Sequence, residues 1–152
     1  MTLTKRYGKL IDVERDFGFN EAVDLTGVTR SQLIHWSDKQ LIVPSVAQTT
    51  GRGVPRRYSF EDLVLVRLAV VLVRDFGFPL SMLGRFLAPV RWAARRGADL
   101  VVLWGTDGTT FPLSSGDVAE IQRALAGTQN KTGLVLDIAA AREWVRARGA
   151  TE

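Results

Sequence analysis

The sequence predicts a mainly α protein that consists of a winged helix-turn-helix domain at residues 19–97 and a small α+β unit of order ββαβα at residues 98–152. Two observations predict this fold. Two short helix signals on either side of a tight turn precede a basic loop rich in glycine and proline. Beyond residue 97, strand-like runs and turn signals alternate with helix signals. Residues 1–18 fit neither pattern and are expected to form an N-terminal arm.

The helix-turn-helix has recognisable start and stop signals. Asn20 has the side chain of an N-cap, residues 21–25 form the expected first helix, and Gly27 can take the left-handed conformation that ends a helix. A T-x-x-Q capping box that begins at Thr29 predicts a second helix ending near Lys39. The large apolar side chains expected to form the small core of this pair are Leu25, Leu33 and Trp36.

The segment 44–58 differs from its neighbours in composition. Its two prolines and two glycines exclude a helix, and its apolar content is too low for a core strand. We expect a hairpin-like loop with a polar and basic tip, which we call the wing.

Two longer helices follow the wing. Ser59 begins the first, with Asp62 at the capping-box position, and its abundant apolar side chains predict that it is mostly buried. Pro79 begins the next helix, which Gly97 ends. Pro89 lies within it and predicts a kink or a restart.

The predicted α+β unit starts with a hairpin. Residues 100–104 and 109–113 are strand-like and flank an Asp-Gly turn signal. Because Pro112 cannot donate a ladder hydrogen bond, the second strand is expected at a sheet edge.

The rest of this unit is a helix, a strand and a last helix. Ser114 and Asp117 have the spacing of a cap for the first of these helices, and Gly127 is its expected end. A third strand is predicted at 134–136, and Asp137 can cap the last helix. A unit of about 50 residues is marginal alone, so it should pack on the first domain or on a second copy of itself.

Composition excludes several classes of function. The 152 residues contain no cysteine, which excludes a disulfide framework, a thiolate metal site and a cysteine nucleophile. His35 is the single histidine, so a histidine-based metal site is not expected. No nucleophile–base pair or nucleotide-binding loop is recognisable either. We therefore expect no catalytic residue and no cofactor, and an enzyme is the weakest interpretation. The apolar run at 68–73 is too short to cross a bilayer, and a signal peptide is not recognisable. We therefore expect a cytoplasmic protein with no membrane partner.

Charge is unevenly distributed along the chain. The formal net charge is +4; residues 1–96 carry 15 Lys/Arg and 9 Asp/Glu, whereas residues 97–152 carry 5 and 7. The basic excess of the first part suggests a polyanionic partner for that part alone. Charge by itself is equally compatible with a basic surface that only keeps the protein soluble.

A helix-turn-helix with a basic wing fits duplex DNA. The start of the second helix can read base edges in the major groove, while wing cations contact phosphates. His35 is either a phosphate contact or an ordinary solvent-facing residue, and Tyr58 either donates a hydroxyl to the DNA backbone or anchors the wing. The candidate DNA-binding residues are Thr29, Arg30, Ser31, His35, Arg52, Arg56, Arg57 and Tyr58.

Several short segments occur in the order and with the spacing of one known domain pattern. They are Phe19–Val23, Thr26–Leu33, His35-Trp36, Leu41–Pro44, Arg56–Ser59, Glu61–Leu63 and Phe76–Leu80 with Leu83 and Leu87. On these segments, residues 19–87 resemble the DNA-binding domain of the MerR family of bacterial transcription regulators. The resemblance implies a homodimer that binds double-stranded DNA at a pseudo-palindromic promoter site and distorts it. Nothing in the sequence identifies a small-molecule effector.

The chain departs from the pattern of that family at three points. Ile34 occupies the position of a common DNA-contacting arginine, and Gln40 that of a common glycine. The long dimerising helix of the family is not visible, because the compact unit at 98–152 follows instead. Since metal-sensing relatives use cysteines in that region, metal sensing of that kind is excluded.

Two other functions remain open at this point. An architectural, excisionase-like protein would use the same winged module to bend DNA, although such proteins tend to be shorter and basic throughout. An antitoxin-like interaction module would use residues 98–152 to bind and mask a partner protein.

Overall fold

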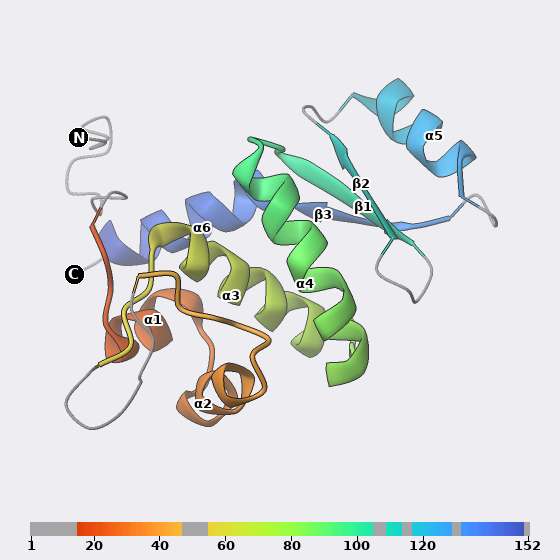
Figure 1. Ribbon diagram of the computed structural model, residues 1–152. Coiled ribbons are helices and arrows are strands. Elements are labelled where there is room, and N and C mark those ends of the chain that lie inside the picture. The colour runs from red at the N-terminus through yellow and green to blue at the C-terminus, as the bar shows by residue number, and fades with distance from the viewer. Residues whose placement is uncertain (1–14, 47–54, 105–108, 114–116, 129–131, 151–152) are drawn as a thin grey trace. The chain divides into compact units, whose positions relative to one another are not determined.

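The computed structural model describes residues 15–46, 55–104, 109–113, 117–128 and 132–150. Within these ranges, the order of elements agrees with the predicted fold class (Figure 1). The elements are α1 (Phe19–Thr26), α2 (Arg30–Asp38), α3 (Phe60–Arg74), α4 (Leu80–Arg95), β1 (Leu100–Trp104), β2 (Thr109–Leu113), α5 (Val118–Ala126), β3 (Leu134–Asp137) and α6 (Ile138–Ala150).

The chain divides into two compact units, of which the first combines residues 1–70 with residues 141–152 and the second is residues 71–140. The last helix thus begins in the second unit and ends in the first. The sequence predicted a domain boundary at residue 97. The two units are groups of residues in spatial contact and do not test that boundary, which remains a prediction.

The core and the second helix of the helix-turn-helix are as predicted. Leu25, Leu33 and Trp36 are all buried. The Thr29 hydroxyl accepts from the Gln32 amide at 3.0 Å, while the Thr29 amide donates to the Gln32 side chain at 3.2 Å, so the capping box is complete.

The first helix starts earlier than predicted. Its N-cap is Gly18 and not Asn20, because the Ala22 amide already donates to the Gly18 carbonyl at 2.9 Å. The Glu21 side chain accepts from the Gly18 amide at 3.1 Å and so satisfies an otherwise unpaired donor of the first turn. Gly27 ends the helix as predicted, with a φ of 80° that an L side chain rarely adopts.

The described parts of the wing are its two ends, and both are fixed to the domain. At the returning end, Tyr58 and Phe17 exchange two backbone hydrogen bonds of 2.8 Å. At the other end, Asp62 accepts from the amide and the hydroxyl of Ser45, each at 2.7 Å. The same carboxylate oxygen caps α3 by accepting from the Ser59 amide at 2.9 Å. The tip of the wing, with Arg52, lies outside the described residues.

The second unit contains the predicted antiparallel sheet, with strand order β2-β1-β3. Leu100 pairs with Leu113 on one side and with Asp137 on the other. The strand with Pro112 is at the edge, as expected. Val102 and Leu113 pack against Ala124 of α5 on one face of this sheet.

Two helix starts in the second unit test the predicted caps. The Asp137 carboxylate accepts from the Ala140 amide at 2.8 Å, which confirms its role as a cap. Asp117 is itself the N-cap of α5, through a 2.8 Å bond from the Ala119 amide, rather than the third helical residue after a cap at Ser114. Ser114 is outside the described residues. α4 continues through Pro89 without a restart.

None of the helices in the described ranges is both long and apolar enough to cross a membrane.

Candidate nucleic-acid interface

Helix α2 has one buried side and one solvent-facing side. Leu33 and Trp36 point into the core, whereas Arg30, Ser31 and His35 are exposed. These three predicted contact residues therefore lie on the accessible side of a helix whose start is fixed by its capping box. The Thr29 hydroxyl is already used in that box, so only part of its hydrogen-bonding capacity remains for a ligand.

Arg30 is held at the start of α2 by residues of α1. Its Nη1 donates to the Asn20 side-chain oxygen, and its guanidinium carbon lies 4.9 Å from the centre of the Phe19 ring. The start of α1 thus orients the first cation of the predicted recognition helix. Sequence reasoning missed this role for Asn20, because a spacing of ten residues across two helices follows no local rule.

Arg56 links the returning end of the wing to α2. Its Nη2 donates to the Asp38 carboxylate at 3.2 Å, at the last residue of α2. The contact brings the wing next to the C-terminal end of the helix, not next to its leading end. Asp38 is 61% exposed, so the ion pair is accessible to solvent.

Arg57 lies near the start of α1. Its Nε and Nη2 donate to the two oxygens of Asp16 at 3.2 and 3.0 Å. This hydrogen bond holds the pKa of Asp16 below its ordinary value and raises the pKa of Arg57. The Arg57 Nη1 lies beside Gly18, where an added Cβ would be 3.1 Å away.

A second ion pair lies beside the first. Arg15 Nη2 donates to a carboxylate oxygen of Glu21 at 2.6 Å, and the guanidinium carbon of Arg15 lies 4.1 Å from the centre of the Phe17 ring. The hydrogen bond from Arg15 lowers the pKa of Glu21. The sequence analysis did not predict a role for Asp16 or Glu21. The only signal for one is the alternation of basic and acidic residues around Arg15.

Tyr58 is fully buried, and burial raises the pKa of its hydroxyl. Of the two roles considered for it, this position favours the anchoring one. His35 is exposed, which is compatible with both of its alternatives.

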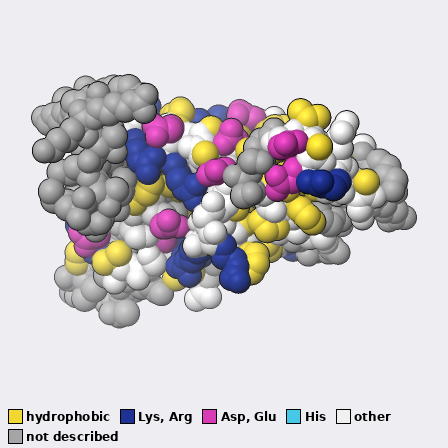
Figure 2. Space-filling view, turned by 90° about the horizontal axis from the view of Figure 1, so that it is seen from above, with side chains coloured by type: hydrophobic (Ala, Val, Ile, Leu, Met, Phe, Trp, Pro, Cys, Tyr) yellow, Lys and Arg dark blue, Asp and Glu magenta, His cyan; other side chains and the backbone are white. Residues whose placement is uncertain are grey.

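Arg15, Arg56 and Arg57 are therefore each paired with an acid, whereas Arg30 donates to the side chain of Asn20. Figure 2, which views the molecule from above Figure 1, shows Lys and Arg side chains next to Asp and Glu side chains on that face as well. Exposed ion pairs contribute only about 0–1 kcal/mol each, so a phosphate can replace a carboxylate at small cost. Among the described residues, no group of three acids or histidines could hold a metal ion.

The family model described as "MerR HTH family regulatory protein" matches residues 19–88. Residues 19–88 are therefore a MerR-type helix-turn-helix domain. The structure describes most of that MerR-type domain, including its helix-turn-helix and both ends of its wing.

The chain is also similar to proteins named as uncharacterised HTH-type transcriptional regulators. Relatives from Mycobacterium bovis and from two strains of Mycobacterium tuberculosis are each 27% identical to it over 115 residues. The match covers 76% of this chain but 50% of each relative, so the chain spans about half the length of these curated relatives.

Two departures from the MerR pattern have structural consequences. Ile34 is 43% exposed on the same side of α2 as Arg30, so it presents an apolar group where the family commonly has an arginine. Gln40 has a φ of 58°, in the left-handed region. Glycine takes this conformation more easily than glutamine, which explains why glycine is common at this position.

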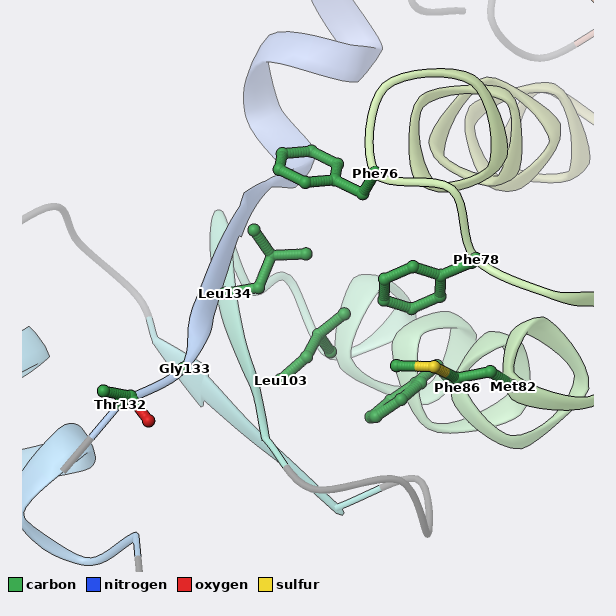
Figure 3. A pocket seen from close by; sticks show the side chains of 8 residues that line it. All are labelled: Phe76, Phe78, Met82, Phe86, Leu103, Thr132, Gly133 and Leu134. Atoms are coloured by element: carbon green, nitrogen blue, oxygen red, sulfur yellow. The ribbon is translucent and has the colours of Figure 1, made fainter. Parts of the chain in front are cut away.

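The second unit contains an apolar pocket of about 400 Å³ (Figure 3). Side chains from the α3–α4 junction, α4, β1 and β3 point into it. They include Phe76, Phe78, Phe86, Leu103 and Leu134.

Proposed function

We propose that the protein is a transcription regulator of the MerR type. It binds a pseudo-palindromic promoter site as a homodimer, through the recognition helix at 29–39 and the wing at 44–58. One observation carries the proposal: the exposed side of α2 presents Arg30, Ser31 and His35 from a capped helix. A helix presented in this way fits the major groove, where its first residues reach base edges.

The wing arginines contribute affinity rather than sequence readout. Arg56 and Arg57 exchange their carboxylate partners for phosphate oxygens when DNA binds. A phosphate offers the same planar pairing to a guanidinium group as a carboxylate, so the exchange needs little rearrangement. The hydrogen bonds to Asp38 and Asp16 restrict the two side chains in the free protein, which reduces the entropy lost on binding.

The test measures affinity for duplex DNA as a function of salt concentration. Wild type, Arg56→Ala and Arg57→Ala are titrated with a fluorescent duplex of about 30 base pairs, close to three helical turns. Each lost phosphate contact is expected to reduce the slope of log K against log salt by about 0.9. Arg123→Ala, on the exposed side of α5, is the matched control and should leave the slope unchanged. Unchanged slopes for both wing variants would show that the wing does not contact phosphates.

Sequence readout needs a separate measurement. Genome-wide capture of bound DNA gives the site, its symmetry and the neighbouring genes. On a captured site, Arg30→Ala is expected to lose about 1–3 kcal/mol of discrimination, as for a lost base contact, while losing less on unrelated DNA. Equal losses on both DNAs would restrict Arg30 to phosphate contacts.

Homodimerisation follows from the symmetry of the proposed site, because two copies read two half-sites. We expect residues 98–152 to supply much of the contact. This part of the chain has exposed large apolar side chains, among them Val118 at 68% and Phe111 at 43% exposure, which are suited to an interface. Light scattering on Phe111→Ser is expected to show a weakened dimer; an unchanged dimer would place the contact elsewhere.

A further inference from the structure

Two arginines from outside α1 reach the carbonyl oxygens of its last turn. Arg148 Nε, in α6, donates to the Asp24 carbonyl at 2.8 Å. Arg67 Nη1, in α3, donates to the Thr26 carbonyl at 3.3 Å. The last carbonyls of a helix have no partner within the helix and carry partial negative charge. Since α1 has no basic residue in its own last turn, these two arginines supply the stabilising charge.

Both guanidinium groups also contact the ring of Trp144, in α6. The guanidinium carbon of Arg67 lies 3.5 Å from the ring centre, and that of Arg148 lies 4.7 Å from it. The ring packs directly against the turn of the helix-turn-helix, since a Cβ added to Gly27 would lie 3.4 Å from its Cη2 atom. Cation–π contacts of this kind are stronger when they are shielded from water.

Helix α6 has a second attachment at the start of α3. The guanidinium carbon of Arg146 lies 5.2 Å from the centre of the Phe60 ring, and its Nη1 donates to Glu143 at 3.1 Å. The C-terminal part of α6 therefore contacts both the turn that leads into α2 and the helix that follows the wing. All these residues belong to the same compact unit.

Short helices depend on such contacts. α1 has 8 residues and α2 has 9. Helices shorter than about 12 residues are marginal alone, so their stability and direction come from tertiary packing. The three residues 27–29 between them set the angle at which α2 leaves α1, and Trp144 covers the first of these residues.

We propose that the C-terminal part of α6 is a positioning element for the recognition helix. Trp144 and Arg148 fix the turn at 27–29 and thereby the direction in which α2 presents Arg30 and Ser31. The consequence for DNA rests on the proposed function, whereas the fixed turn is a property of the free protein.

The test uses the full chain with Trp144→Leu and Arg148→Gln. In the free protein, amides of residues 24–38 should exchange hydrogen about tenfold faster, with those of α4 and β1 unchanged. Affinity for the captured site should fall about tenfold with an unchanged salt slope, because no phosphate contact is lost. Trp144→Phe keeps an aromatic ring. It should therefore show little of either effect, with exchange rates and affinity close to those of the wild type. Arg123→Gln, which removes the same charge elsewhere, should change neither.

The outcomes separate this inference from the proposed function. Unchanged exchange at residues 24–38 in both variants overturns the positioning role, whatever happens with DNA. Faster exchange with full affinity for the captured site overturns it as well, since the turn would then not matter for recognition. A wild-type protein that binds no duplex DNA refutes the proposed function instead, while the exchange result still decides whether α6 fixes the turn. Should Trp144→Leu fail to fold, Arg148→Gln decides, because this side chain is exposed.

Discussion

Replacing Asp62 with alanine should destabilise the protein by releasing the start of the wing from the first turn of α3. One carboxylate oxygen accepts three hydrogen bonds, two from Ser45 at 2.7 Å and one from the Ser59 amide at 2.9 Å. The side chain that makes them is 1% exposed. A single residue thus joins the start of the wing to the first turn of α3.

The magnitude follows from these three bonds. Hydrogen bonds to a charged group contribute about 1.5–3 kcal/mol each, but Ser45 is exposed and water replaces part of what it loses. The alanine variant also no longer buries a carboxylate, which offsets part of the loss. We expect a net decrease of about 3 kcal/mol in the free energy of unfolding. For a protein of this size, this corresponds to a melting temperature lower by about 6–12 °C.

Thermal and urea denaturation measure the effect. Glu61→Ala is the matched control: it removes a neighbouring, exposed carboxylate from the same helical turn and should change stability by less than about 0.5 kcal/mol. Asp62→Asn keeps an acceptor without the charge and should lie between the two. If Asp62→Ala were within about 1 kcal/mol of the control, the carboxylate would not hold the wing, and the reasoning above would be refuted.

Three further substitutions test local features. Gln40→Gly removes a side chain from a residue with a φ of 58° and should raise the free energy of unfolding by about 0.5–1 kcal/mol in urea denaturation. Gly133→Ala would place a Cβ 3.1 Å from the Leu103 carbonyl oxygen and should cost about 1–3 kcal/mol by the same measurement. Asp16→Asn should make the free energy of unfolding fall less steeply as the pH is lowered. Because Arg57 holds the pKa of Asp16 below its ordinary value of 3.8, the ion pair stabilises the fold above about pH 4, and this stability is lost as the pH falls through the lowered pKa.

Each of these changes has its own control. Gln40→Ala keeps the backbone penalty and should bring no gain; an equal gain would mean that the left-handed conformation is not the cause. Gly127→Ala places a Cβ in ordinary contact, 3.4 Å from the nearest carbonyl oxygen, and should be tolerated better than the change at Gly133. Identical acid slopes for wild type and Asp16→Asn, measured by urea denaturation between about pH 3 and pH 7, would contradict the assigned role of that pair.

Start and stop signals were predictable because they depend on residues three or four apart. The capping box of Thr29 and Gln32 and the left-handed Gly27 are present as predicted. The hairpin and its edge strand were predictable for the same reason, since alternation and a turn signal are local. The start of α1 was misplaced by two residues, because Glu21 stabilises a turn that begins at glycine. A glycine has no capping side chain to reveal it.

The sequence alone determined the order of elements, the helix-turn-helix and the MerR-type pattern of that domain, since these follow from neighbouring residues and from the spacing of short segments. Only the tertiary structure decided what each arginine meets. Arg56 pairs with an acid 18 positions away, Arg57 with one 41 positions away, and Arg148 with a carbonyl 124 positions away. No periodicity carries such pairings, because they depend on how packed helices place distant side chains. For that reason the sequence did not reveal the partners of these arginines, nor the contact between the last helix and the turn that leads into the recognition helix.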